Sequence, residues 1–96
     1  MTNIRIHRYA VDEENLEEFI ARRAALIAAM RERHPGLTET RLIRLDDGSF
    51  VDTWRWASAD EMQAAFASVP DMPEVRAAMS LARNASNDDG EVVDER

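Results

Sequence analysis

The chain has 96 residues and no cysteine, so it suits one small domain without a disulfide framework or a thiolate metal site. Its 19 acidic and 12 basic residues give a formal charge of −7, which argues against binding to nucleic acid or anionic membranes. No apolar run could cross a bilayer and the first residues lack a signal-peptide pattern, so we expect a cytoplasmic protein. A core this small is marginal, and dimerisation is a common remedy.

The first third of the chain predicts a strand followed by a long helix. Residues 4–11 alternate and are rich in β-formers. We expect Asp12 to cap a helix with glutamates in its first turn and cations in its last, ended by Pro35 and Gly36. The predicted apolar face of this helix consists of Leu16, Phe19, Ile20, Leu26, Ile27 and Met30.

The middle of the chain predicts an antiparallel hairpin. Residues 37–45 and 50–57 are typical of strands, and the Asp47-Gly48 pair suits a turn that needs positive φ. A two-residue turn would put Glu39 and Arg41 on the helix-facing side of the sheet. A bulge in the hairpin would turn some of these side chains to the other face. The expected pairs are Ile43 with Asp52, Arg41 with Trp54 and Glu39 with Trp56.

The last third predicts a broken helix and a short strand. The pattern S-x-x-E from Ser58 is a capping box that begins a helix, and Pro70 breaks it. Pro73 can start a second helical segment at its first position. The stretch 84–90 is typical of a loop, and we expect residues 91–94 to form the fourth strand.

This order of elements indicates one α+β domain, residues 1–96, with a ferredoxin-like βαββαβ fold. Its four-stranded antiparallel sheet would carry the helices on one face. The other face would hold Leu42 and Val51 among polar neighbours, and a second copy could cover it in a homodimeric α/β barrel. The acidic tail, residues 88–96, would be an edge strand or disordered.

A few polar residues break the inside–outside pattern and are candidates for function. Arg23 lies in the apolar helix stripe, where a charge needs a partner or a ligand. Asp52 shares a strand face with Trp54 and Trp56. We expect a partly buried Arg23–Asp52 ion pair, the polar floor of a ligand pocket walled by the tryptophans, or both; the tryptophans could equally be core residues. His7 could carry protons or be a surface or interface group.

The usual catalytic motifs are missing. The sequence has two histidines and three glycines, and it contains no metal-ligand cluster, glycine-rich phosphate loop, nucleophile elbow or Ser-His-Asp set. Chemistry would therefore depend on the pocket and on its substrate.

The segment 52–58, followed by an amphipathic helix and a proline-broken turn, resembles the antibiotic biosynthesis monooxygenase (ABM) family. Proteins of this family have a W-x-S strand-to-helix junction, here Trp56-Ala57-Ser58. The motif covers residues 52–79, and the element order extends the resemblance over nearly the whole chain. The resemblance implies a dimeric α/β barrel. Its most similar members look like cofactor-independent enzymes that oxidise phenolic anthrones to quinones with dioxygen, without metal, flavin or haem.

The resemblance also implies site residues. The family's pocket tryptophan and arginine fall on Trp56 and Arg76, which match in type. Its pocket asparagine and tyrosine fall on Asp52, which could act as a base, and Met62, which cannot donate a hydrogen bond. The haem-degrading branch needs a histidine where this chain has Met79, so haem degradation is not expected.

The leading hypothesis is a cofactor-independent monooxygenase that acts on a small phenolic or polycyclic aromatic metabolite. The catalytic candidates are Asp52 as base or hydrogen-bond acceptor, Trp56 as a stacking wall, and Arg76, aided by Arg23, as oxyanion stabiliser. The substrate-binding candidates are Trp54, Met62, Phe66, Arg23, His7 and Met79. Two alternatives stay open: a non-catalytic small-molecule-binding dimer, and a non-redox cyclase or isomerase with Asp52 as its base.

Overall fold

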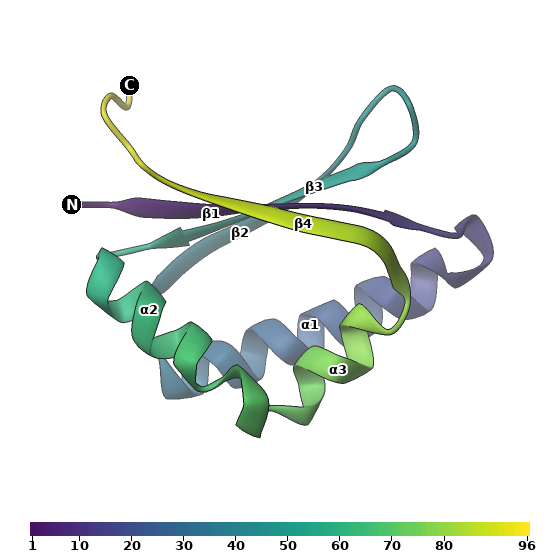
Figure 1. Cartoon of the computed structure of the whole chain (residues 1–96), viewed down its shortest axis with the longest axis horizontal. Helices are drawn as coiled ribbons and strands as arrows, with labels where there is room; N and C mark the ends of the chain where they lie inside the picture. Colours follow the sequence, from purple (N-terminus) through teal and green to yellow (C-terminus); the bar gives the residue numbers. More distant parts are fainter.

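The computed structural model describes all 96 residues as a four-stranded antiparallel sheet with its helices on one face (Figure 1). The strand order across the sheet is β2-β3-β1-β4. The elements are β1 (Asn3–Val11), η1 (Glu13–Asn15), α1 (Leu16–Arg33), β2 (Leu37–Arg44), β3 (Phe50–Trp56), α2 (Ala59–Ala67), η2 (Val69–Asp71), α3 (Pro73–Met79) and β4 (Ala82–Glu91). The predicted α+β, ferredoxin-like architecture is confirmed. None of the helices is long and apolar enough to traverse a bilayer.

The two central strands direct one parity of side chains toward the helices. In β3 the residues Phe50, Asp52, Trp54 and Trp56 are buried, and those between them are half-exposed. His7 of β1 lies opposite Asp52 in the register, so the odd-numbered side chains of β1 share the same covered face. The main core cluster includes Tyr9, Val11, Phe19, Leu26, Ile27, Met30, Leu37, Phe50, Trp54, Trp56, Met62, Ala65, Met72 and Ala78.

Helix α1 buries most of its predicted apolar stripe. It differs from the prediction at one stripe residue and at its N-terminal cap. Ile20 is 48% exposed, although it shares a helix face with the buried Ile27 seven residues later. Asp12 does not cap the helix with its side chain. Its carboxylate instead accepts a hydrogen bond from Arg83 at 2.7 Å, and the chain enters α1 through the short η1 turn.

The hairpin between β2 and β3 has a three-residue loop, so the predicted pairing is wrong by one residue. Leu45 N–H donates to the Ser49 carbonyl at 2.8 Å, and Gly48 takes a φ of 88°, the left-handed conformation this loop requires. The partner of Asp52 is therefore Leu42. A shift of one residue turns every side chain over. The residues Glu39, Arg41 and Ile43 consequently lie on the open face, and Leu42 packs against the core.

The fourth strand lies earlier in the chain than predicted. The expected loop 84–90 forms most of β4, and only Glu91 of the expected strand belongs to it. This sequence has little β-propensity, but β4 pairs along β1, where Arg5 and Arg8 form ion pairs with Asp89 and Asp88. Contacts with the neighbouring strand therefore override the local preference.

The second helical region is divided as the prolines predict. Ser58 Oγ accepts a hydrogen bond from the Glu61 backbone N–H at 3.2 Å, which is the predicted cap of α2. Helix α2 ends before Pro70, and Pro73 is the first residue of α3. Figure 1 shows α3 lying against α1 beneath the sheet, with α2 to the left, on the side of the N-terminal end of α3.

Candidate functional site

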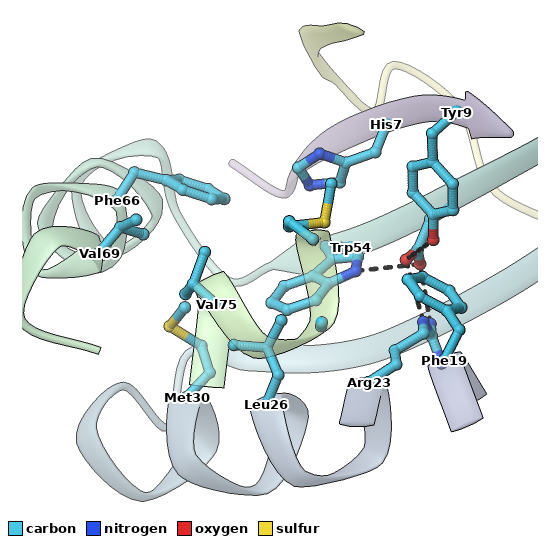
Figure 2. A pocket seen from close by; sticks show the side chains of 13 residues that line it. His7, Tyr9, Phe19, Arg23, Leu26, Met30, Trp54, Phe66, Val69 and Val75 are labelled. Carbon is cyan, nitrogen blue, oxygen red and sulfur yellow. Dashed lines mark hydrogen bonds and ion pairs between the residues drawn. The ribbon is translucent and has the colours of Figure 1, made fainter. Parts of the chain in front are cut away.

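A cavity of about 100 Å³ lies between the covered face of the sheet and the helices (Figure 2). Ten of its 13 lining residues are hydrophobic, so a ligand would have to be largely apolar. The lining residues from the sheet are His7, Tyr9, Asp52 and Trp54; those from α1 are Phe19, Arg23, Leu26 and Met30. The helical region after the hairpin adds Phe66, Val69, Val75, Ala78 and Met79.

Asp52 is the centre of a buried polar network at one end of this cavity. Its Oδ1 accepts hydrogen bonds from Arg23 Nη2 at 2.8 Å and Trp54 Nε1 at 3.0 Å. Its Oδ2 accepts from Tyr9 Oη at 2.7 Å and Arg23 Nε at 3.0 Å. Asp52 is only 4% exposed, and Figure 2 shows Arg23 extending from α1 toward the hydroxyl end of Tyr9. The predicted Arg23–Asp52 ion pair is therefore confirmed.

Because four donors surround Asp52, each carboxylate oxygen has two hydrogen bonds and no lone pair directed at the cavity. A carboxylate in this position orders the side chains around it, as buried bidentate pairs with arginine do. The geometry thus fits a structural anchor better than the base suggested by the sequence.

Tyr9 was not among the sequence candidates, although it has the same strand parity as His7. Burial raises the pKa of its phenol well above 10.0, and the adjacent Asp52 charge and hydrogen bond raise it further. The hydroxyl group therefore stays protonated and donates to Asp52. Tyr9 is a fixed donor and not a proton acceptor.

His7 differs from the other polar residues of the cavity because its imidazole makes no hydrogen bond within the protein. The ring lies edge-on to Trp54, with centroids 5.9 Å apart, and is tilted against Phe66 at 6.3 Å. Burial lowers the pKa of His7 from 6.5, and the nearby charges act in both directions. The imidazole is thus neutral at neutral pH, with a free lone pair beside the cavity.

Arg5 fixes the aromatic wall near His7, a role that the sequence did not suggest. Its guanidinium carbon lies 3.5 Å from the centroid of the Phe66 ring. The same group donates two hydrogen bonds to Asp89 of β4, at 2.6 and 2.8 Å. The only available signal was that Arg5 shares the strand parity of His7.

The structure brings six of the predicted site residues together, and leaves three out of the cavity wall. His7, Arg23, Asp52, Trp54, Phe66 and Met79 line the cavity. Trp56 is fully buried behind Phe66, with ring centroids 5.9 Å apart, and its Nε1 has no hydrogen-bond partner. Met62 is buried in the core, and Arg76 is exposed on α3. The three outside the wall are all positions carried over from the family resemblance.

No group of three or more His, Asp or Glu side chains is close enough together to hold a metal ion. The cavity itself provides one imidazole, one guanidinium and one carboxylate whose oxygens are fully hydrogen-bonded, among aromatic and aliphatic side chains. This arrangement can bind a small aromatic molecule, order it by stacking, and accept a proton at His7.

Comparison with known proteins identifies a family and a shared fold. The profile of the family described as antibiotic biosynthesis monooxygenase matches residues 4–81. No curated protein matches the sequence.

Among solved structures, SnoaB, a cofactor-independent oxygenase from Streptomyces nogalater, is 23% identical with a TM-score of 0.77, covering 98% of this chain and 95% of its own. Rv0793 from Mycobacterium tuberculosis is 18% identical with a TM-score of 0.74, covering 99% and 98%. A variant of MhuD, solved with two manganese protoporphyrin IX molecules per active site, is 24% identical with a TM-score of 0.69, covering 98% and 97%. At these identities the likeness shows the shared fold.

Proposed function

Because the chain belongs to the antibiotic biosynthesis monooxygenase family, we propose that it oxidises a phenolic or polycyclic aromatic metabolite with dioxygen and without a cofactor. The observation that carries this proposal is the apolar, aromatic-walled cavity with an unpartnered imidazole at its side. The similarity to SnoaB, whose description is that of a cofactor-independent oxygenase, supports it as an analogy of fold.

The proposed reaction needs only the substrate and dioxygen. The phenol loses its proton, and the phenolate transfers one electron to dioxygen, which becomes superoxide. The substrate radical and superoxide then join in a new C–O bond at a ring carbon that carries hydrogen. The resulting peroxide takes up a proton, its O–O bond breaks as the C–H proton leaves, and the products are a quinone and one water.

In this proposal the protein supplies orientation and a dry environment. Trp54 and Phe66 provide flat walls for the substrate ring. Arg23, held by Asp52, places a fixed positive charge near the developing phenolate. Trp56 acts by supporting Phe66 from behind, and Arg76 would need a movement of α3 to contact the substrate.

We further propose that the protein acts as a homodimer formed through the open face of the sheet. Ile4 and Ile6 of β1 lie on this face together with Val51 and with Ile43, which is 40% exposed. These side chains form an apolar centre among charged neighbours such as Arg41 and Arg55. Burying them against a second copy would remove apolar surface from water.

A second candidate function is binding without turnover. Two observations favour it: Met62 replaces the tyrosine of the family motif, and neither Met62 nor Arg76 reaches the cavity. The non-redox cyclase or isomerase hypothesis depends on Asp52 as a base, which is disfavoured by its four hydrogen bonds.

Dioxygen consumption by metal-stripped protein distinguishes the proposed monooxygenase from a protein that binds without turnover. A single-ring phenol and a dihydroxyanthrone serve as substrates, with Val75→Phe, which fills the cavity, as the negative control. Protein-dependent uptake that Val75→Phe abolishes is the expected result. Uptake no faster than the spontaneous background, while calorimetry shows that the same compounds bind, would favour the binding protein.

A further inference from the structure

The size of the cavity limits how much of a substrate it can enclose. Its volume is about 100 Å³. An engineered cavity of about 150 Å³ accommodates one benzene molecule, whereas sites for drug-sized ligands measure roughly 300–1,000 Å³. A cavity of this volume therefore has room for at most one aromatic ring, and further rings would remain at its mouth.

The polar lining limits how that ring can be oriented. The Asp52 oxygens are occupied by donors from Arg23, Tyr9 and Trp54. Arg23 and Trp54 can only donate hydrogen bonds. His7 is therefore the one basic group at the cavity whose lone pair is free to receive a hydroxyl hydrogen.

We propose that the cavity encloses a single phenolic ring, stacked between Trp54 and Phe66, with its hydroxyl group donating to His7, which accepts the phenol proton. In that step the phenol O–H bond breaks and an N–H bond forms on the imidazole. The electron pair stays on the oxygen as a phenolate. Enclosure of the ring is independent of oxidation, whereas the catalytic role of the proton transfer rests on the proposed function.

The charges that face His7 allow this transfer. Asp52 on β3 is paired with Arg23 on α1, and Asp89 on β4 is paired with Arg5 on β1. The charges around His7 are therefore balanced in pairs, and burial is the largest cause of its lowered pKa. After transfer, the negative charge of Asp52 favours the new imidazolium of His7.

Anaerobic calorimetry with phenol and anisole tests the proposed orientation, because anisole has the same ring and no hydroxyl hydrogen. Wild-type protein should bind phenol about tenfold more tightly than anisole, the value of one good hydrogen bond. In His7→Leu the two affinities should agree within about twofold. His34→Gln is the matched control, because His34 bonds Ser68 away from the cavity, and it should behave as wild type.

Longer ligands test the size of the site. A naphthol and a dihydroxyanthrone should each bind less than about threefold more tightly per added ring, because the added rings stay largely in water. Full enclosure would increase affinity roughly tenfold per ring. Such an increase would overturn the single-ring proposal, and a phenol preference that persists in His7→Leu would overturn the role of His7.

His7→Gln separates proton acceptance from hydrogen bonding, because the amide oxygen accepts a hydrogen bond but is not a base. This variant should keep the preference for phenol while its oxygen consumption falls at least about 100-fold. Unchanged consumption would refute proton acceptance by His7. A wild-type protein that binds phenol as described but consumes no oxygen would refute the proposed function alone.

Discussion

The guanidinium of Arg23 and the carboxylate of Asp52 join α1 to β3 through two hydrogen bonds of 2.8 and 3.0 Å. The pair lies at the end of the cavity, and Asp52 also receives donors from Tyr9 and Trp54. It therefore fixes the height of α1 above the sheet and the orientation of one cavity wall. The shape of the cavity depends on this buried charge pair, even though neither member needs to take part in the proposed proton transfer.

Removing one partner of this pair should be costly. Arg23→Met leaves the buried carboxylate without its counter-charge, and we expect the free energy of unfolding to fall by about 3 kcal/mol. Urea denaturation followed by circular dichroism measures this. Arg33→Met, at an exposed site on the same helix, should change it by less than about 1 kcal/mol. A loss below about 1 kcal/mol for Arg23→Met would show that the pair does not anchor α1.

Val75 and Arg76 are neighbours on α3 but differ in their relation to the cavity. Val75 lines the cavity and Arg76 is exposed. We expect Val75→Phe to weaken phenol binding more than about tenfold, because the new ring occupies the space, while Arg76→Ala leaves the affinity unchanged. Calorimetry provides the affinities. Loss of binding in Arg76→Ala would mean that α3 rotates on binding and that the position implied by the family resemblance is correct.

The activity should require neutral His7. As pH falls through the pKa of His7, which burial places below 6.5, the imidazole gains a proton and loses its free lone pair. The rate of oxygen consumption should therefore be level near neutral pH and fall on the acid side. The rate is measured against the spontaneous oxidation at each pH. An activity that rises with acidity would contradict this role.

The same lowered pKa predicts a pH effect on folding. Between pH 6.5 and the pKa of folded His7, the unfolded chain binds more protons at this residue, so stability decreases as pH decreases. His7→Gln should make the free energy of unfolding less dependent on pH in that window. Denaturation curves at several pH values test this. An equal slope in the wild type and the variant would place the pKa of folded His7 at its ordinary value.

The proposed dimer can be tested with two isoleucines of similar exposure. Ile43 is 40% exposed on the open sheet face, and Ile20 is 48% exposed on α1. Ile43→Arg should give monomers because it buries an unpaired charge in the interface, whereas Ile20→Arg should leave the dimer intact. Light scattering after size-exclusion chromatography measures the mass. A dimer that is disrupted only by Ile20→Arg would place the interface on the helices.

Local pattern predicted much of the site because the strand period of two determines which residues share a face. This period placed Asp52 with Trp54, and a charge in an apolar helix stripe identified Arg23 as its partner. Loop length was harder to predict. The hairpin could close with a two- or three-residue loop, and the positive φ of Gly48 allows the three-residue loop. The resulting register places Glu39 and Arg41 on the open face.

Features that depend on packing were beyond the sequence pattern. The strand β4 forms a ladder with β1, in which Arg5 and Arg8 meet acidic residues, although residues 84–90 look like a loop. The resemblance to the family assigned pocket roles by position in the sequence. Trp56 nevertheless lies outside the cavity wall, because it is buried behind Phe66. Which side chains line a pocket is decided by neighbouring elements that a local motif does not contain.

The most direct test of the account is the fate of isotopically labelled dioxygen in the reaction of a single-ring phenol with metal-stripped protein. The account predicts that one labelled oxygen atom enters the quinone formed from a phenol and the other becomes water, and that Val75→Phe abolishes this incorporation. Quinone that contains no label, or product that forms equally well without dioxygen, would contradict a monooxygenase.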